Sequence, residues 1–533
     1  MHYLLVFLML SVACSMVVSC IPMHCKQNQP TTESIDSAFL IALDESLSRC
    51  GQYKIDIRDL TISQFQEHFQ AGRLTSAELT QCYLDRIERI DVHLKSVIEI
   101  NPEAITLARK ADRERSANSN QSPMHGIPIL IKDNIGTADC MQTTAGAVAL
   151  ENIKPKYDAD VVRRLRKAGA IILGKTNLSE WASFRDTSTP NGWSGRGGQT
   201  VSAYVMNADP SGSSTGSAVS VSTNLATVSL GTETDGSIIS PASRNAVVGL
   251  KTTIGKVSTR GVIPLSFSRD VVGPMARTVQ DAAILLGAIS DIDLHGCDVD
   301  VSACLPEKNL TIGVLREMFW ISWDTIGTLS QLDNCLNNIN KVKLVQVIDP
   351  ALSPKPIPAI KEEVVVIFGH EFKFSINNYL RDDVDHFESE LGRNISSLAD
   401  IIQYNEINPP NEGYRQRLLK LAEFTDGLES VTYINAKNQS REQSISFLDS
   451  IFEKYEVDVL ASPCHLLYSY GAFAGYPSIS VPVGVDSTNT GLPFGLCLLG
   501  KLNSEPELLK LGHIIELSRS SERPVPRFIR DKE

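Results

Sequence analysis

Apolar and polar residues alternate along most of the chain with the periods of helices and strands. The capping box at 75–78 begins a predicted helix whose apolar face runs from Leu79 to Ile90. Residues 160–167 predict a second helix, closed by Gly169, and the apolar run 170–173 predicts a buried strand directly after it. Such close succession of helix and strand is typical of layered α/β proteins.

The same alternation returns in the second half of the chain. Residues 310–315 predict a strand, 325–340 a helix and 342–348 another strand. Between 192 and 236 the chain is rich in Gly, Ser and Thr, but it keeps apolar runs that a pure linker would lack. With no internal repeat and no clear break in composition, residues 51–525 are predicted to form one large α/β domain.

The N-terminus follows a different pattern. Residues 3–21 are almost wholly apolar and uncharged, with small residues ahead of Cys20. We predict a signal peptide over 1–20 and a polar spacer over 21–50. A retained anchor helix, a lipid on Cys20 and a misplaced start are the alternatives. The main interpretation predicts a secreted or envelope (periplasmic) protein, whose membrane association is restricted to this N-terminus.

Charge and cysteine content narrow the function classes further. The chain has 533 residues with a net charge of −12, and nucleic-acid binding normally needs a basic face, so no nucleic-acid partner is predicted. The eleven cysteines contain no CxxC pair and are too sparse for a disulfide scaffold. In an oxidising compartment, the predicted disulfides are Cys25 with Cys50 and Cys297 with Cys304.

Two short motifs match the Walker A and nucleophile-elbow patterns, but the residues within or before each motif do not fit the structure that its function needs. Residues 169–176 match the Walker A pattern, but they form a predicted buried strand where a phosphate loop must be open. Residues 212–216 match the nucleophile elbow GxSxG, but Pro210 and other turn residues precede them where a buried strand is needed. No HExxH or other metal-ligand cluster occurs, so no metal site is predicted.

Three other segments carry candidate chemistry. An apolar strand after His125 ends in Lys132, and burial can lower a lysine pKa by ~3–5 units, which would make it a general base. A lysine that reaches solvent from the strand end is the alternative. Residues 212–217 form a Gly/Ser loop, either a linker or a site. Residues 231–237 form a Gly-flanked loop, either a tight turn or an anion-binding nest.

Together these segments resemble the amidase signature family of serine hydrolases. The similarity runs from about residue 60 to residue 500 and extends beyond the three segments to 248–251, 273–277, 474–477 and 481–484. The segments most similar to bacterial peptide amidases are 177–181, 196–200 and 232–237. The resemblance implies a single domain with a mixed central β-sheet covered by helices.

The resemblance also implies a Ser-cisSer-Lys triad that needs no metal or cofactor. Lys132 falls at the family's lysine, Ser213 at its bridging serine and Ser237 at its nucleophile. The peptide bond between Gly212 and Ser213 is expected to be cis. The backbone N–H groups expected to form the oxyanion hole are those of Thr234, Asp235, Gly236 and Ser237.

Some positions differ from common family patterns. Asp235 stands where many members have glycine, and we expect its carboxylate to point away from the oxyanion hole, toward substrate or neighbouring residues. Ile239 stands where many members have arginine. The candidates for lining the substrate pocket, with a purely structural role as the equal alternative, are Glu180, Trp181, Arg196 and Gln199.

These implications predict a serine amidase that hydrolyses carboxamides to a carboxylic acid and ammonia. Its partner would be a small-molecule or peptide amide, with peptide C-terminal amides as the candidate substrates. Within the family, the alternatives are a glutaminase like the ammonia-supplying part of the glutamyl-tRNA(Gln) amidotransferase, which an export signal argues against, and a fatty-acid amide hydrolase. An inactive family member that acts as a binding module is the non-enzymatic alternative.

Overall fold

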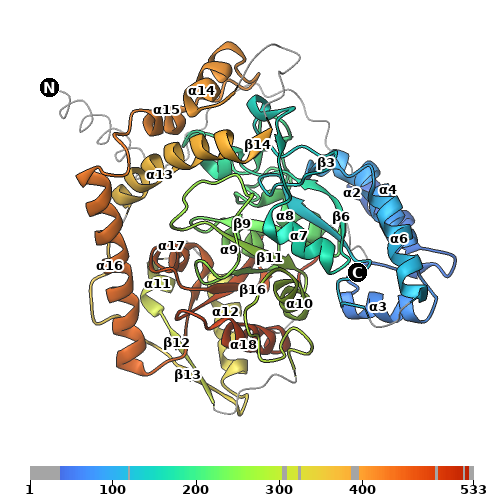
Figure 1. The fold of residues 1–533 in the computed structure, drawn as a ribbon. Coiled ribbons are helices and arrows are strands. Elements are labelled where there is room, and N and C mark those ends of the chain that lie inside the picture. Colours follow the sequence, from blue (N-terminus) through green and yellow to red (C-terminus); the bar gives the residue numbers. More distant parts are fainter. Residues whose placement is uncertain are drawn as a thin grey trace. The chain divides into compact units, whose positions relative to one another are not determined.

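A mixed sheet of 11 strands runs through the fold (Figure 1). Its strand order is β13-β12-β15-β17-β16-β10-β11-β9-β4-β6-β3. Strands β12 and β4 each pair in parallel with both of their neighbours, and every other neighbouring pair in this sheet is antiparallel. The predicted mixed central sheet is therefore confirmed. The strands of the sheet are β3 (Val97–Ile100), β4 (Pro128–Lys132), β6 (Ile171–Thr176), β9 (Val228–Glu233), β10 (Val248–Lys251), β11 (Val271–Ala276), β12 (Leu310–Val314), β13 (Val345–Ile348), β15 (Val459–Pro463), β16 (Ser478–Val485) and β17 (Pro493–Gly500).

The structure, a computed structural model, describes residues 37–526 apart from 118–120, 303–308, 322–325, 360, 386–394, 487–489 and 520–521. Three small two-stranded sheets lie outside the main one: β1 (Arg49–Cys50) with β2 (Ile55–Asp56), β5 (Lys154–Pro155) with β14 (Val384–Asp385), and β7 (Trp193–Ser194) with β8 (Gly198–Gln199). The α-helices are α2 (Ser37–Leu47), α3 (Ile62–Gln70), α4 (Ser76–Arg86), α5 (Val92–Leu94), α6 (Ala104–Ala117), α7 (Asp160–Lys167), α8 (Thr215–Ser222), α9 (Ile239–Arg244), α10 (Val279–Ile289), α11 (Arg316–Ile321), α12 (Ile326–Ile339), α13 (Lys361–Asp382), α14 (Leu398–Ile407), α15 (Arg417–Glu423), α16 (Val431–Tyr455), α17 (Cys464–Ala474) and α18 (Glu505–Ser518).

Helices cover both faces of the sheet, and strand β16 shows how the faces are divided. Its residues Ile479 and Val481 lie against Gly512 of α18, whereas the hydroxyl of Ser480 lies 3.4 Å from the sulfur of Cys464 in α17. Alternate residues of a strand point to opposite faces, so α18 and α17 lie on opposite sides of the sheet. Helices α10 and α12 pack beside α18, and α9 packs between α17 and α8.

Helices α13 to α16 form a separate group that packs on the loops that follow strands β4 and β6. Its apolar core joins α13, through Phe368 and Phe372, to Trp181 and Phe184 of the loop after β6. Aromatic rings of this size contribute much of the buried apolar area in such a core. The group therefore fixes the loops that surround the end of β4.

Several predicted elements are confirmed at their expected positions. Thr75 and Glu78 cap the N-terminus of α4 reciprocally, because each side chain accepts a hydrogen bond from the other's backbone N–H. The predicted helix at 160–167 is α7, and the predicted strands at 310–315 and 342–348 contain β12 and β13. The predicted helix at 325–340 is α12.

The predicted spacer over 21–50 differs from the structure in its second half. Helix α2 occupies Ser37–Leu47, and Leu40 and Leu43 are buried against the rest of the fold. Asp44 is also buried and pairs with Arg86 of α4. The folded unit therefore includes Ser37–Leu47, which precede residue 51. The predicted signal peptide over 1–20 lies outside the described residues, and within them no helix has the length and apolarity needed to cross a bilayer.

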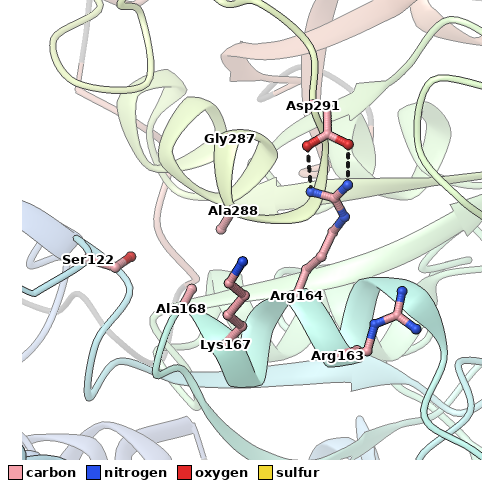
Figure 2. A pocket seen from close by; sticks show the side chains of 8 residues that line it. All are labelled: Ser122, Arg163, Arg164, Lys167, Ala168, Gly287, Ala288 and Asp291. Carbon is pink, nitrogen blue, oxygen red and sulfur yellow. Dashed lines mark hydrogen bonds and ion pairs between the residues drawn. The ribbon is translucent and has the colours of Figure 1, made fainter.

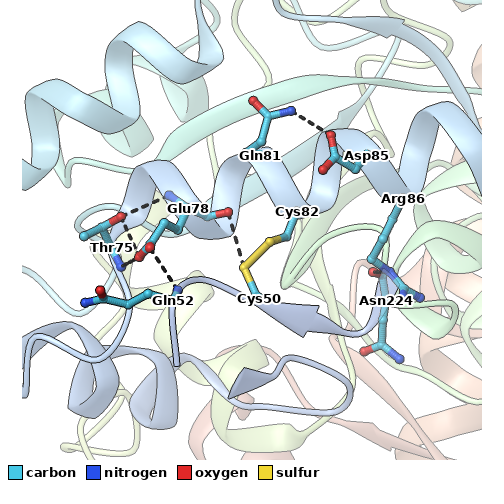
Figure 3. Close-up of a disulfide and its surroundings, with 9 residues drawn as sticks. All are labelled: Cys50, Gln52, Thr75, Glu78, Gln81, Cys82, Asp85, Arg86 and Asn224. Carbon is cyan, nitrogen blue, oxygen red and sulfur yellow. Dashed lines mark hydrogen bonds between the residues drawn. A yellow bond between two sulfur atoms is a disulfide. The ribbon is translucent and has the colours of Figure 1, made fainter. Parts of the chain in front are cut away.

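Cysteine pairing is the clearest correction to the sequence analysis. Cys50 is bonded to Cys82 of α4 and not to Cys25, since β1 brings it beside that helix (Figure 3). A second disulfide that the sequence did not predict joins Cys464 of α17 to Cys497 of β17. Cys297 is disulfide-bonded as well, whereas its predicted partner Cys304 lies outside the described residues.

Removing the Cys50–Cys82 disulfide is expected to destabilise the fold. The two cysteines are 32 residues apart in sequence, and freeing a loop of that size lowers the free energy of unfolding by about 3–4 kcal/mol. Urea denaturation of the double variant Cys50→Ala, Cys82→Ala measures this loss. Cys140→Ala, at an exposed free cysteine, is the control and should leave the midpoint unchanged. Equal midpoints for all three proteins would contradict the prediction.

Candidate active site

Lys132 lies at the end of β4 with its side chain fully buried. Its Nζ donates hydrogen bonds to the hydroxyl oxygens of Ser213 at 2.8 Å, Ser214 at 2.9 Å and Thr232 at 2.9 Å. The main-chain oxygen of Thr232 lies 3.1 Å away. The alternative in which this lysine reaches solvent is therefore wrong.

The surroundings of Lys132 favour its uncharged form. All of its hydrogen-bond partners are neutral oxygens, and none is a carboxylate. Burial lowers the pKa of Lys132 from 10.5 to about 7, against the opposing effect of the more distant carboxylates of Asp270 and Glu233. A substantial fraction of the amine is then neutral near pH 7, where its lone pair can accept a proton.

Ser213 follows the cis peptide bond that the family resemblance implied, between Gly212 and Ser213. Its main-chain oxygen accepts a hydrogen bond from the N–H of Ser179 at 3.1 Å, which holds the loop against the segment after β6. The next residue, Ser214, precedes helix α8, and its hydroxyl donates to the Thr232 main-chain oxygen at 3.0 Å. The Gly/Ser stretch at 212–217 is thus a fully packed part of the site and not a linker.

Small residues in α8 explain why this stretch can approach the sheet so closely. Every residue of Thr215–Ser222 is buried, and the helix packs on β4, β6, β9 and β11. A Cβ on Gly216 would lie only 2.2 Å from the main-chain oxygen of Ser96. The start of α8 therefore brings Ser213 and Ser214 within hydrogen-bond distance of the lysine at the end of β4.

Ser237 lies in the turn between β9 and α9, beside the same helix start. Its main-chain oxygen accepts a hydrogen bond from the N–H of Ser214 at 3.1 Å, so the two serine segments are joined directly. The carboxylate of Glu233 accepts from the N–H groups of Ile238 at 2.7 Å and Ile239 at 3.0 Å. Within the described part of the chain, the N–H groups of residues 234–237 have no acceptor of their own. They are available to an oxyanion.

The remaining side chains of this loop are held by neighbours. Thr234 donates its hydroxyl proton to Asp270 at 2.6 Å, and Asp235 accepts a hydrogen bond from Ser469 of α17 at 2.8 Å. Burial raises the pKa values of Asp235 and Asp270 to about 6. The Asp235 carboxylate is thus bound to a neighbour, one of the two roles expected from the sequence.

Residue 236 is a glycine for two reasons: its backbone conformation and the lack of room for a side chain. Its φ is +81°, and a Cβ at this position would lie 2.7 Å from the ring of Tyr468. A side chain would therefore strain the backbone and displace the aromatic ring that packs on the loop.

The four candidate pocket residues all contact the fold itself. Glu180 forms a buried ion pair with Arg185 and accepts the N–H of Gly195 at 2.7 Å. Trp181 is buried and packs edge-on against Phe372. The remaining two contacts are an ion pair from Arg196 to Glu99 and a hydrogen bond from Gln199 to the Asn191 main-chain oxygen. These contacts support the structural alternative for all four residues, and none of the four contacts Lys132, Ser213 or Ser237 through a hydrogen bond.

Sequence reasoning missed three residues that complete the cluster. Ser214 and Thr232 supply most of the oxygens around the lysine amine, and Asp270 positions Thr234. Ser214 and Thr232 lie inside the segments 212–217 and 231–237 that the sequence analysis singled out. The sequence thus indicated their segments, but it did not show that these two side chains contact Lys132. Asp270 lies 33 residues beyond Ser237, and only the pairing of β11 with β9 brings it close.

Figure 2 shows a pocket lined mainly by residues of α7 and by Gly287 and Ala288 of α10. Arg163, Arg164 and Lys167 of α7 line it, and Arg164 is paired with Asp291 across its edge. None of the residues that line it belongs to the candidate active site. In the part of the chain that the structure describes, no group of three or more His, Cys, Asp or Glu side chains is arranged to hold a metal ion.

The arrangement of these residues, with a buried lysine amine beside serine hydroxyls, agrees with that of a serine hydrolase. The chain belongs to the amidase family, because the family model described as Amidase matches residues 78–509. It is accordingly an amidase, an enzyme that hydrolyses amide C–N bonds.

Relatives and solved structures agree with this family. A probable amidase of Arabidopsis thaliana is 38% identical over 520 residues, covering 94% of this chain and 96% of that protein. The native peptide amidase of Stenotrophomonas maltophilia is 38% identical, with a TM-score of 0.78 over 88% of this chain and 99% of that one. A glutamyl-tRNA(Gln) amidotransferase subunit from a Synechococcus strain is 32% identical over 513 residues, covering 88% of this chain and all of that protein.

Proposed function

We propose that the chain hydrolyses the C-terminal amides of peptides, with Lys132 as base, Ser213 as proton bridge and Ser237 as nucleophile. The observation that carries the proposal is the buried Lys132 amine, 2.8 Å from the Ser213 hydroxyl and with its pKa lowered to about 7. A lysine in this state can act as a general base at neutral pH, which an exposed lysine cannot.

The reaction follows from the proton affinities of these groups. Neutral Lys132 accepts the proton of Ser213 while Ser213 accepts that of Ser237, and the Ser237 oxygen attacks the amide carbon. The N–H groups of residues 234–237 stabilise the negative oxygen of the tetrahedral intermediate. Ser213 then donates a proton to the leaving nitrogen, which departs as ammonia and leaves an ester on Ser237. Water repeats the cycle on the ester and releases the carboxylic acid.

The peptide substrate is supported by the likeness to the Stenotrophomonas maltophilia peptide amidase. That enzyme aligns with 88% of this chain at 38% identity, whereas the amidotransferase protein is less similar at 32%. A peptide amide is therefore favoured over glutamine.

An exported location is part of the same proposal. Disulfides form and persist in oxidising compartments, and the Cys50–Cys82 and Cys464–Cys497 disulfides support a secreted or envelope protein. The apolar run at 3–21 would direct the chain there as a signal peptide or hold it at a membrane as an anchor.

Ammonia release from a panel of amides tests the proposed substrate class. We expect kcat/KM for a peptide C-terminal amide to exceed that for glutamine by at least about 100-fold, since a site shaped for peptides discriminates through several contacts. The panel also contains a simple aliphatic amide and a long-chain fatty amide. Ammonia released from glutamine alone would favour an amidotransferase-like glutaminase, and preference for the fatty amide would favour lipid hydrolysis.

A further inference from the structure

Arg269 is a buried arginine that makes few polar contacts with the described residues. It lies in the turn before β11 and is only 3% exposed. Its Nη1 donates to the hydroxyl of Ser268 at 3.0 Å, and its Nε has no acceptor. Among the described residues, no carboxylate forms an ion pair with it. Burying a guanidinium with donors unpaired is costly, so its position requires an explanation.

Two aromatic rings lie close to the guanidinium of Arg269. The central carbon of Arg269 lies 4.1 Å from the ring centre of Phe473 in α17 and 5.9 Å from that of Phe368 in α13. Stacking of this kind uses the flat face of the guanidinium and leaves the N–H groups in its plane free to donate. The stacking therefore helps to fix the arginine in place without occupying any of its N–H donors, of which only Nη1 is used by a described residue, Ser268.

Helix α17, which stacks on Arg269 through Phe473, also contacts the loop at residues 234–237. Phe473 lies four residues after Ser469, so the two side chains share one face of α17. Ser469 donates its hydroxyl proton to Asp235, two residues before the proposed nucleophile. On its other side Arg269 adjoins Asp270, which binds Thr234 of the loop. The charges of Arg269 and Asp235 also affect each other's pKa, so the arginine lies near the loop at residues 234–237.

Other buried arginines in this protein indicate which acceptor fits. Arg277 donates to the main-chain oxygens of Val221 and Ala226, and Arg86 donates to that of Asn224. Both obtain main-chain carbonyls from the fold, whereas Arg269 obtains none. Burial lowers the pKa of Arg269, and the nearby carboxylates of Glu371, Asp235 and Asp270 oppose this effect by favouring its protonated form. A neutral acceptor is therefore favoured over an additional anion.

We propose that Arg269 binds a main-chain carbonyl oxygen of the substrate, on the acyl side of the amide that is cleaved. The ligand would be an acylated amino-acid amide, in which the acyl carbonyl precedes the residue that bears the amide. This inference rests on the proposed function and deepens it, because it names the substrate group that distinguishes a peptide amide from a simple amide.

A pair of matched substrates tests this role. N-acetylphenylalaninamide carries the acyl carbonyl, and 3-phenylpropanamide lacks the whole acylamino group but keeps the ring and the amide. For Arg269→Met we expect kcat/KM on the first substrate to fall about 10- to 100-fold, and that on the second to change less than about threefold. Arg269→Lys should retain part of the preference, because it keeps a positive donor.

The controls separate this role from a structural one. Arg277→Met removes another buried arginine and should reduce thermal stability while leaving the preference between the two substrates unchanged. An equal loss of Arg269→Met activity on both substrates, or no loss on either, would overturn the inference. If the wild-type enzyme cleaves 3-phenylpropanamide as efficiently as the acetylated amide, the inference also fails. If it releases no ammonia from either compound, the proposed function itself is wrong.

Discussion

The Ser237→Ala variant is expected to lose ~10⁴–10⁶-fold in kcat, because removal of a serine nucleophile leaves only binding and the oxyanion hole to catalyse the reaction. The Ser237 backbone stays in place, since its main-chain oxygen accepts the Ser214 N–H and does not depend on the hydroxyl. Binding of a peptide amide should therefore be retained. Single-turnover ammonia release, with binding measured separately, checks both expectations.

A neighbouring serine provides the control for this variant. Ser240 lies in the first turn of α9, where its hydroxyl is 2.9 Å from that of Ser211 and outside the lysine cluster. Ser240→Ala should keep nearly full activity and should still be labelled covalently by a fluorophosphonate, whereas Ser237→Ala should not be labelled. Full activity of Ser237→Ala would exclude it as the nucleophile. A wild-type protein that binds peptide amides without cleaving or labelling would instead be a binding module.

The sequence predicts the fold best in segments where the pattern of apolar residues matches the burial of those residues in the structure. Strand β4 is buried along its whole length, and its apolar run shows this in the sequence. Lys132 stands out because a charged residue ends that run. The spacing of Ser213 and Ser237 followed from family resemblance and not from periodicity, since loops carry no repeating pattern.

The missed features depend on residues far apart in sequence. Asp44 looks like a surface residue of a polar segment, yet it is buried because Arg86 pairs with it from α4. Cys50 has several cysteines within reach of the unfolded chain, and only the packing of β1 beside α4 selects Cys82. Arg269 likewise gives no local signal, because its burial arises from Phe368 and Phe473, about 100 and 200 residues later. Tertiary contacts of this kind cannot be deduced from one sequence.

Replacement of Lys132 by methionine is expected to lower kcat/KM by ~10²–10⁴-fold at pH 8, the usual loss when a general base is removed. The pH profile provides the sharper test. In the wild type, protonation of Lys132 below its pKa of about 7 removes the base, so kcat/KM should rise about tenfold per pH unit up to pH 7 and then level off. Lys132→Met should lose this step and retain only a weak, flatter dependence.

Lys175→Met is the control for Lys132→Met, because it measures how much stability and activity are lost when any buried lysine is replaced. Lys175 is also fully buried, its pKa is lowered to about 8 by burial, and its Nζ donates to the Ile135 main-chain oxygen and the Thr143 hydroxyl, both at 2.7 Å. Lys175→Met should therefore cost stability and some overall activity but keep the step near pH 7. If the step persists in Lys132→Met or disappears in Lys175→Met, the titrating base is not Lys132. If the pH step is lost from Lys132→Met and kept in Lys175→Met, the titrating base is Lys132, whose amine contacts the Ser213 hydroxyl.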